Sequence, residues 1–260
     1  MCLAVVALDA HPDYALVVAA NRDEWHARPA APAAWWPDGL LAGRDLAARG
    51  TWLGLSREGR FAFLTNLRDP ARHDPLAPSR GALVPRVIAD PAPVAEALAQ
   101  ARAASSRHNG YNLVAGAASG VASTSNRHEG VRTLAPGVHG VSNGPIDDAW
   151  PKTRRMMLAM SRWIGRAGID LEPLFAALAD RTEAPDAELP STGVPLERER
   201  LLSAVFIRDA RYGTRCSTVL AIGRDGIATF VERSFAPDGR VTGEVTERFA
   251  IQPSARSIAR

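Results

Sequence analysis

The sequence predicts an α+β protein in which large antiparallel sheets are covered by helices. Short apolar runs bounded by Gly, Pro, Asn and Asp, which are typical of strands, occur near both ends and in the middle of the chain. Helical stretches lie between these blocks without regular strand–helix alternation, which argues against a Rossmann or TIM-barrel fold. The 260 residues contain no internal repeat and no linker, so we expect a single domain over 1–260.

The first two strands are expected at 3–8 and 15–20, because both runs are apolar and a short segment with Asp and Pro joins them. The polar motif Asn21-Arg22-Asp23-Glu24 follows directly. A simple turn would prefer Gly or Pro. The motif is therefore either a polar network at the end of a sheet or the surroundings of a reactive group.

A Pro- and Ala-rich segment, 28–39, is expected to be an extended surface loop. It contains Trp35 and Trp36, which either form the wall of an apolar pocket or pack into the core. A further strand is expected at 60–65, ending at Asn66.

The middle of the chain is expected to form two helices followed by a β-meander. The helices are expected at 82–89 and 93–104, the second with Pro near its first turn. The strands of the meander are the short apolar runs at 111–116, 121–125, 130–134 and 137–142.

The last part of the chain is expected to contain two more helices and the final strands. One helix begins at Trp150-Pro151 and has an apolar face at helical spacing, and a short helix follows at 170–179. After a loop over 182–195, strands are expected at 204–207, 217–222, 227–233 and 244–251. The tail from Pro253 is expected to be frayed.

Composition and charge exclude several classes of protein. The net charge is +3, and the basic residues, nearly all Arg with Lys152 the only lysine, are scattered among 28 acidic residues, which argues against nucleic-acid binding. With only Cys2 and Cys216, neither a disulfide framework nor a metal site is expected. Without an apolar stretch of membrane-spanning length or a secretory signal, a cytoplasmic protein is expected. The sequence does not predict how many subunits it forms.

Cys2 is the residue best suited to catalysis. If an aminopeptidase removes Met1, Cys2 carries both a thiol and a free α-amine. Such an amine titrates at about pH 8 and can act as a base at neutral pH. A nucleophile activated by its own terminal amine is an established route to covalent catalysis. The alternative is an inert thiol at the start of a strand.

The motifs together resemble the NRDE family, also called the transport-and-Golgi-organisation protein 2 (TANGO2) family. The matching residues run along nearly the whole chain, in the order Met1-Cys2, Asn21-Arg22-Asp23-Glu24, Gly50-Thr51-Trp52, Thr65-Asn66, Ser79-Arg80-Gly81, Tyr111-Asn112, Ser142-Asn143 and Gly213-Thr214-Arg215. That family is similar to N-terminal-nucleophile hydrolases such as choloylglycine hydrolases and penicillin V acylases. The similarity implies a four-layer αββα sandwich of two antiparallel sheets.

The resemblance also implies a chemistry: hydrolysis of a non-peptide C–N bond in a linear amide, with a small-molecule substrate and no metal or organic cofactor. By this resemblance Cys2 would be the nucleophile and Asp23 would contact its amine. Asn66 and Asn143 would lie in the oxyanion region, and Arg215 near the thiol. Further contacts to the substrate are expected from Asn21, Arg22, Trp35 and Trp36.

One position departs from the hydrolase pattern. Those enzymes usually place Arg immediately before Asn-x-Asp, whereas Ala20 precedes Asn21 here. Arg22 is nearby, but adjacent residues of a strand face opposite ways.

The resemblance carries a rival function as well, a non-catalytic protein that binds or traffics haem or a lipid in the same pocket. Haem can be ligated by Cys or His. None of the histidines lies in a diagnostic motif; they are His11, His26, His73, His108, His128 and His139.

Overall fold

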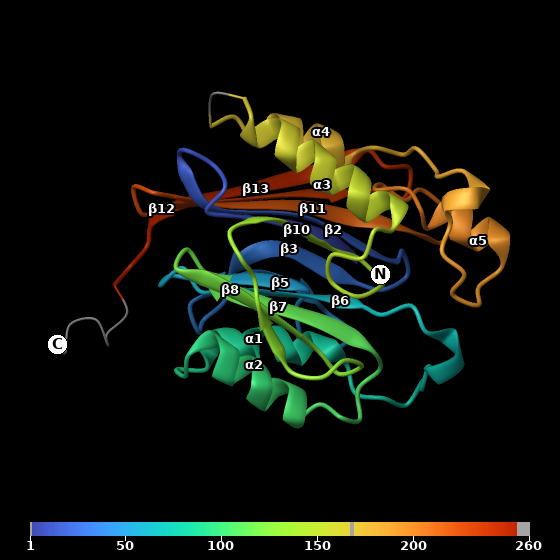
Figure 1. Ribbon diagram of the computed structural model, residues 1–260, viewed down its shortest axis with the longest axis horizontal. Helices are drawn as coiled ribbons and strands as arrows, with labels where there is room; N and C mark the ends of the chain where they lie inside the picture. Colours follow the sequence, from blue (N-terminus) through green and yellow to red (C-terminus); the bar gives the residue numbers. More distant parts are fainter. Residues whose placement is uncertain (1, 167–168, 254–260) are drawn as a thin grey trace.

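The protein consists of two antiparallel β-sheets packed face to face, with helices on both outer faces (Figure 1). The computed structural model describes residues 2–166 and 169–253. Helices α3 (Pro151–Ile164) and α4 (Glu172–Leu178) cover one sheet, and α1 (Leu83–Ala89) and α2 (Val94–Ala103) cover the other. The predicted α+β class and four-layer αββα sandwich are therefore confirmed.

The first sheet has six strands in the described part of the chain, in the order β10-β1-β2-β11-β12-β13. Their bounds are β1 (Cys2–Leu8), β2 (Tyr14–Trp25), β10 (Gly137–Val141), β11 (Tyr212–Gly223), β12 (Ile227–Phe235) and β13 (Val241–Ala250). Strand β2 continues through residues 21–24, so the polar motif lies inside a strand and not after it.

The second sheet has seven strands within the described residues, and each pairs with the next along the chain. Their bounds are β3 (Ala30–Trp35), β4 (Leu40–Asp45), β5 (Leu53–Ser56), β6 (Phe61–Asn66), β7 (Tyr111–Ala117), β8 (Gly120–Ser125) and β9 (Val131–Thr133). Shorter helical turns lie in the connections: η1 (Pro70–Arg72), η2 (Arg80–Ala82), η3 (Asp186–Glu188) and α5 (Leu196–Leu201).

Three apolar layers hold the sandwich together, and strand alternation decides which side chain enters which layer. In β1, Ala4, Val6 and Leu8 enter the core between the sheets. The intervening side chains of β1 pack beneath α3 and α4, against Met156, Met160 and Phe175. A third layer joins α1 and α2 to the second sheet. Because β1 is buried on both faces, it is apolar along its whole length.

Three predictions of local structure are wrong. Residues 28–39 are not simply a loop, because they contain the edge strand β3. The run at 137–142 does not complete the meander but crosses over to pair with β1. The run at 204–207 is buried without forming a strand, after a short helix, α5, that the sequence did not predict. The tail from Pro253 is expected to be frayed, and all of it beyond Pro253 lies outside the described residues.

Candidate active site

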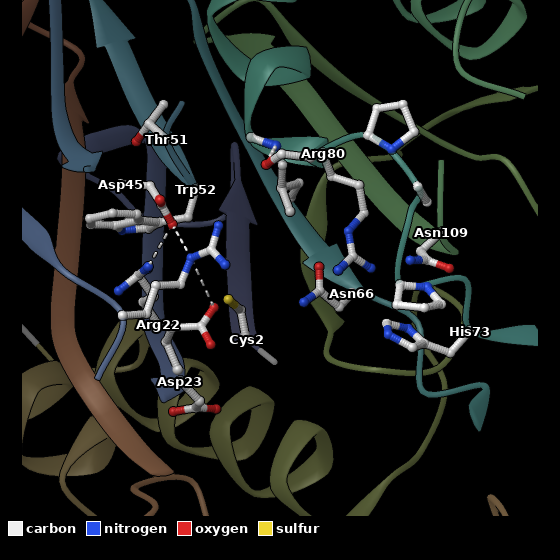
Figure 2. A pocket seen from close by; sticks show the side chains of 18 of the residues that line it. Cys2, Arg22, Asp23, Asp45, Thr51, Trp52, Asn66, His73, Arg80 and Asn109 are labelled. Atoms are coloured by element: carbon white, nitrogen blue, oxygen red, sulfur yellow. Dashed lines mark hydrogen bonds and ion pairs between the residues drawn. The ribbon is translucent and has the colours of Figure 1, made fainter. Parts of the chain in front are cut away.

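A polar cavity of about 350 Å³ opens at the end of the sandwich where β1 begins (Figure 2). Both sheets contribute to it: Cys2 and Arg22 come from the first sheet and Asn66 from the second, and Trp52 lies just before β5 of the second sheet. The loop over residues 73–81 closes the far side. A cavity of this size suits a small molecule.

Cys2 and Arg22 are directly opposite each other in the β1–β2 register. The next pair on the same face is Ala4–Ala20, and both of these side chains enter the core between the sheets. Arg22 therefore shares a face with Ala20, two residues earlier, and with the thiol. Position 22, and not position 20, therefore places an arginine on the side of the sheet where the thiol lies.

The Arg22 guanidinium is held from two sides. Its Nη2 donates to Asp45 Oδ2 at 3.1 Å, and the group stacks over the Trp52 ring at 4.2 Å. Asp45 also accepts a hydrogen bond from Arg28 Nε at 2.6 Å. One carboxylate thus orders two arginines on the wall of the cavity.

Burial raises the pKa of the Cys2 thiol above its ordinary value. The Arg22 charge and a hydrogen bond from the backbone N–H of Asp23 act in the opposite direction and offset part of this rise in pKa. At neutral pH the thiol is therefore protonated, and a nucleophilic Cys2 needs a base to accept its proton.

Asp23 lies on the opposite face of β2 from Arg22, and Figure 2 shows its carboxylate turned toward the helical layer. Thr214 Oγ1 donates to Asp23 Oδ1 at 2.7 Å, and Lys152 Nζ on α3 lies 3.9 Å from Oδ2. Both members of this ion pair are fully buried. Burial raises the pKa of Asp23 and lowers that of Lys152 to about 8, each against the attraction of the other.

Asn66 and Asn143 lie together, but their environments differ. The Asn143 Nδ2 donates to the Asn66 backbone carbonyl at 2.8 Å, and Asn143 is not among the residues that line the cavity. Asn66 does line it, and Figure 2 shows its amide facing the space beside Cys2. Asn112 donates to Thr65 Oγ1 of the same sheet and adds a second link toward the first sheet through the Gly144 carbonyl, just beyond β10.

The structure does not bring Arg215 to the thiol. Its Nη1 donates to the backbone carbonyls of Trp25, His26 and Arg28, and it sits at an irregularity where β11 pairs with β2. The charge that acts on the Cys2 pKa from this part of the site is Arg22. The physical reason is that the register places Arg22, and not Arg215, in the row of the thiol.

Asn21 points to the helix-covered face of β2 and serves the packing of that layer. Its Nδ2 donates to the carbonyls of Leu178 and Val205, and its Oδ1 accepts from Ser217. Its side-chain amide is therefore already engaged within the protein, whereas the alternate residue Arg22 faces the cavity.

Trp35 and Trp36 do not line the cavity of Cys2. Trp35 donates to Glu247 and packs on Phe249, and Trp36 donates to the Ala42 carbonyl on the other face of the sheet. The aromatic wall beside Cys2 is Trp52.

Sequence reasoning missed the roles of Lys152 and Arg80. Lys152 had a usable signal, since it is the only lysine in an arginine-rich chain. Arg80 stood in a recognised motif, Ser79-Arg80-Gly81, but the motif alone did not show that its side chain enters the cavity. In the described residues, no group of three or more His, Cys, Asp or Glu is placed to hold a metal ion. None of the helices described is both long and apolar enough to cross a membrane.

The fold and the site define an αββα protein with a half-buried thiol at the mouth of a polar cavity. The chain belongs to the family described as Transport and Golgi organisation 2, whose sequence model matches residues 1–237. It is 32% identical to the Transport and Golgi organization protein 2 homolog of Bos taurus over 95% of this chain and 97% of the relative. It is 31% identical to the Homo sapiens homolog, over 90% of this chain and 93% of the relative.

Two solved structures are similar in outline. One is a Caenorhabditis elegans ortholog of N-acylethanolamine-hydrolyzing acid amidase, with 13% identity and a TM-score of 0.46 over 84% of this chain and 92% of that chain. The other is a mutant conjugated bile acid hydrolase from Clostridium perfringens, with 9% identity and a TM-score of 0.43 over 98% of both chains.

Proposed function

We propose that this protein is a cysteine hydrolase that cleaves the C–N bond of a non-peptide, linear amide, with Cys2 as its nucleophile. The observation that carries the proposal is the position of Cys2, which lines a small-molecule-sized cavity directly opposite Arg22. A thiol with an inert structural role has no need of a cavity, a facing cation and polar groups from both sheets.

The proposed reaction begins with removal of Met1, which frees the α-amine of Cys2. This amine accepts the thiol proton, and Sγ attacks the carbonyl carbon of the amide. The C–N bond breaks as the amine returns the proton to the leaving nitrogen. A water molecule then hydrolyses the thioester, which releases the acid and restores the thiol.

The polar groups around Cys2 have separate roles in this proposal. The Asn66 amide stabilises the oxyanion, a contribution whose loss typically costs about 10²–10³ in rate. Asn143 positions Asn66 through its bond to the Asn66 carbonyl. Asp23 holds the α-amine, and Lys152 balances the charge of Asp23. Arg22 favours the thiolate as it forms.

Haem binding, the rival function, finds little support in the same cavity. Cys2 and His73 line it and are chemically able to ligate iron. The walls, however, are largely charged, with Arg22, Arg28 and Arg80 among the lining residues. A porphyrin ring needs extended apolar faces, so these residues do not fit it.

Two further histidines, the buried His11 and the partly buried His139, are engaged in contacts within the protein. His11 stacks on Trp163 at 4.6 Å, and its Nδ1 accepts from the Asp13 backbone N–H. His139 bonds to Asp147 and to the Ala135 carbonyl.

The proposal is tested by intact mass and by thiol labelling of the same preparation. We expect loss of Met1, and we expect iodoacetamide to modify Cys2 much faster than Cys216. Cys216 is a matched internal control, because it is buried and its pKa is raised well above the ordinary value. Quantitative retention of Met1 in active protein would exclude the α-amine as base, and equally slow labelling of both thiols would count against a nucleophilic Cys2.

A further inference from the structure

Arg80 is the cavity arginine that no carboxylate balances within the described residues. Arg22 and Arg28 share Asp45, and Arg28 also lies 3.9 Å from Glu24. For Arg80, in contrast, the described part of the chain offers no acidic group within ion-pair distance. Its Nη1 donates to the Gly110 carbonyl at 2.9 Å.

The backbone around Arg80 is fixed by close contact with a second motif. The N–H of Thr51 donates to the Gly81 carbonyl at 3.1 Å. A Cβ on Gly50 would lie 2.4 Å from the Gly81 carbonyl carbon, so only glycine permits this approach. The motifs 50–52 and 79–81 thus lock together, which positions Arg80 before any ligand arrives and lowers the entropic cost of binding.

The guanidinium is directed into the cavity beside Asn66, and in Figure 2 the Asn66 amide lies between it and Cys2. Burial lowers the Arg80 pKa, and the charges that act on that pKa include Cys2 and Glu24. Asp74 also lines the cavity, but its Oδ1 accepts from the Leu76 N–H, and it is not among the charges that act on Arg80.

A single hydrogen bond to Gly110 leaves most of the Arg80 donors available, since a guanidinium carries five N–H groups in a planar fork. A carboxylate matches that fork with two parallel hydrogen bonds.

We propose that Arg80 binds a carboxylate of the substrate, so that the amide attacked by Cys2 belongs to a molecule with a negative charge close to the scissile bond. The substrate class is then a carboxylate-bearing linear amide, not a neutral apolar one. The substrate class rests on the proposed function. The binding of a carboxylate by Arg80 does not, and it can be tested without any catalytic turnover.

The test compares labelling of Cys2 by iodoacetate and by iodoacetamide, which differ by one negative charge. The ratio of the two rates cancels the intrinsic reactivity of the thiol and reports the charge beside it. We expect Arg80→Gln to lower the iodoacetate-to-iodoacetamide ratio about fivefold, since unit charges in contact in water interact by about 1 kcal/mol. Arg80→Lys should retain most of the wild-type ratio.

The control is Arg86→Gln, the same charge change on the exposed side of α1. It should leave the ratio unchanged. A ratio that is equal in wild type and Arg80→Gln, both folded by circular dichroism, overturns the proposal.

A second measurement does not need a reactive thiol. Succinate should raise the melting temperature of the wild type and have no such effect on Arg80→Gln, with inorganic phosphate at equal ionic strength as the comparison. A larger shift with phosphate, or no shift with either, overturns the assignment of a carboxylate. If Cys2 proves unreactive while the succinate shift persists, the hydrolase function fails and the carboxylate site stands.

Discussion

Replacing Lys152 by methionine tests the buried ion pair behind Cys2. Lys152 Nζ lies 3.9 Å from Asp23 Oδ2, and the two side chains are 1% and 0% exposed. Removing one partner of a buried pair leaves an uncompensated charge and typically costs about 3–5 kcal/mol. Methionine is similar in length and keeps the packing. We therefore expect Lys152→Met to lower the free energy of unfolding at pH 7 by about 3 kcal/mol.

The double variant measures the interaction energy between Lys152 and Asp23. Asp23→Asn alone should also destabilise, because it removes the charge partner of Lys152 and alters the bond from Thr214. Lys152→Met combined with Asp23→Asn removes both charges, and its cost should be smaller than the sum of the two single costs by at least about 1 kcal/mol.

The pH dependence has a definite sign. The folded-state pKa of Lys152 is lowered from 10.5 to about 8, so between these values the unfolded state binds more protons than the folded state. Stability therefore rises with pH across this window and is lost as the pH falls through about 8. From pH 7 to pH 10 the gain from this group is about 2–3 kcal/mol. Lys152→Met lacks this gain, so its deficit relative to wild type should widen as the pH rises.

Urea unfolding followed by tryptophan fluorescence at pH 7, 8.5 and 10 measures all four proteins. Two results would refute the reasoning. One is a coupling energy between the two substitutions that is indistinguishable from zero. The other is a difference between wild type and Lys152→Met that does not change with pH.

Two further substitutions probe the frame of the site. Gly50→Ala should lower the free energy of unfolding by about 3 kcal/mol or more in urea unfolding, because its Cβ would lie 2.4 Å from the Gly81 backbone. Its control is Gly243→Ala, whose Cβ would have no atom within 4 Å and which should stay within about 0.5 kcal/mol of wild type. Arg215→Ala should lower the free energy of unfolding by about 1–3 kcal/mol, because it loses hydrogen bonds to backbone carbonyls. It should change the rate of Cys2 labelling less than twofold. A large fall in that rate would show that Arg215 acts on the thiol after all.

Much of the fold follows from local pattern, and the failures have physical causes. Helices such as α2 and the hairpin of β11 and β12 carry their signals within a few residues. The run at 137–142 was recognised as a strand, but its partner β1 lies far away in sequence, and no local pattern specifies that pairing. The apolar run at 204–207 is buried as irregular chain, and burial alone does not distinguish that from a strand.

The site was harder to predict than the fold because it depends on facing and register. The sequence pointed to Cys2, Asp23 and Asn66, which the structure places at or beside one cavity. It could not show that Arg22 is the residue opposite Cys2, since that requires the β1–β2 register. Arg80 reaches the same cavity from the short helical turn η2, and no periodicity in the sequence predicts where that turn lies.

The family motifs make physical sense as connections between the two sheets at one end of the sandwich. Cys2 belongs to the first sheet and Asn66 to the second, so their separation depends on how the sheets are joined there. Asn143, just beyond β10 of the first sheet, donates to the Asn66 carbonyl of the second. Asn112 on the second sheet donates back to the Gly144 carbonyl. Reciprocal bonds of this kind fix the gap between the Cys2 thiol and the Asn66 amide. Motif residues outside the cavity therefore determine its shape as much as those that line it.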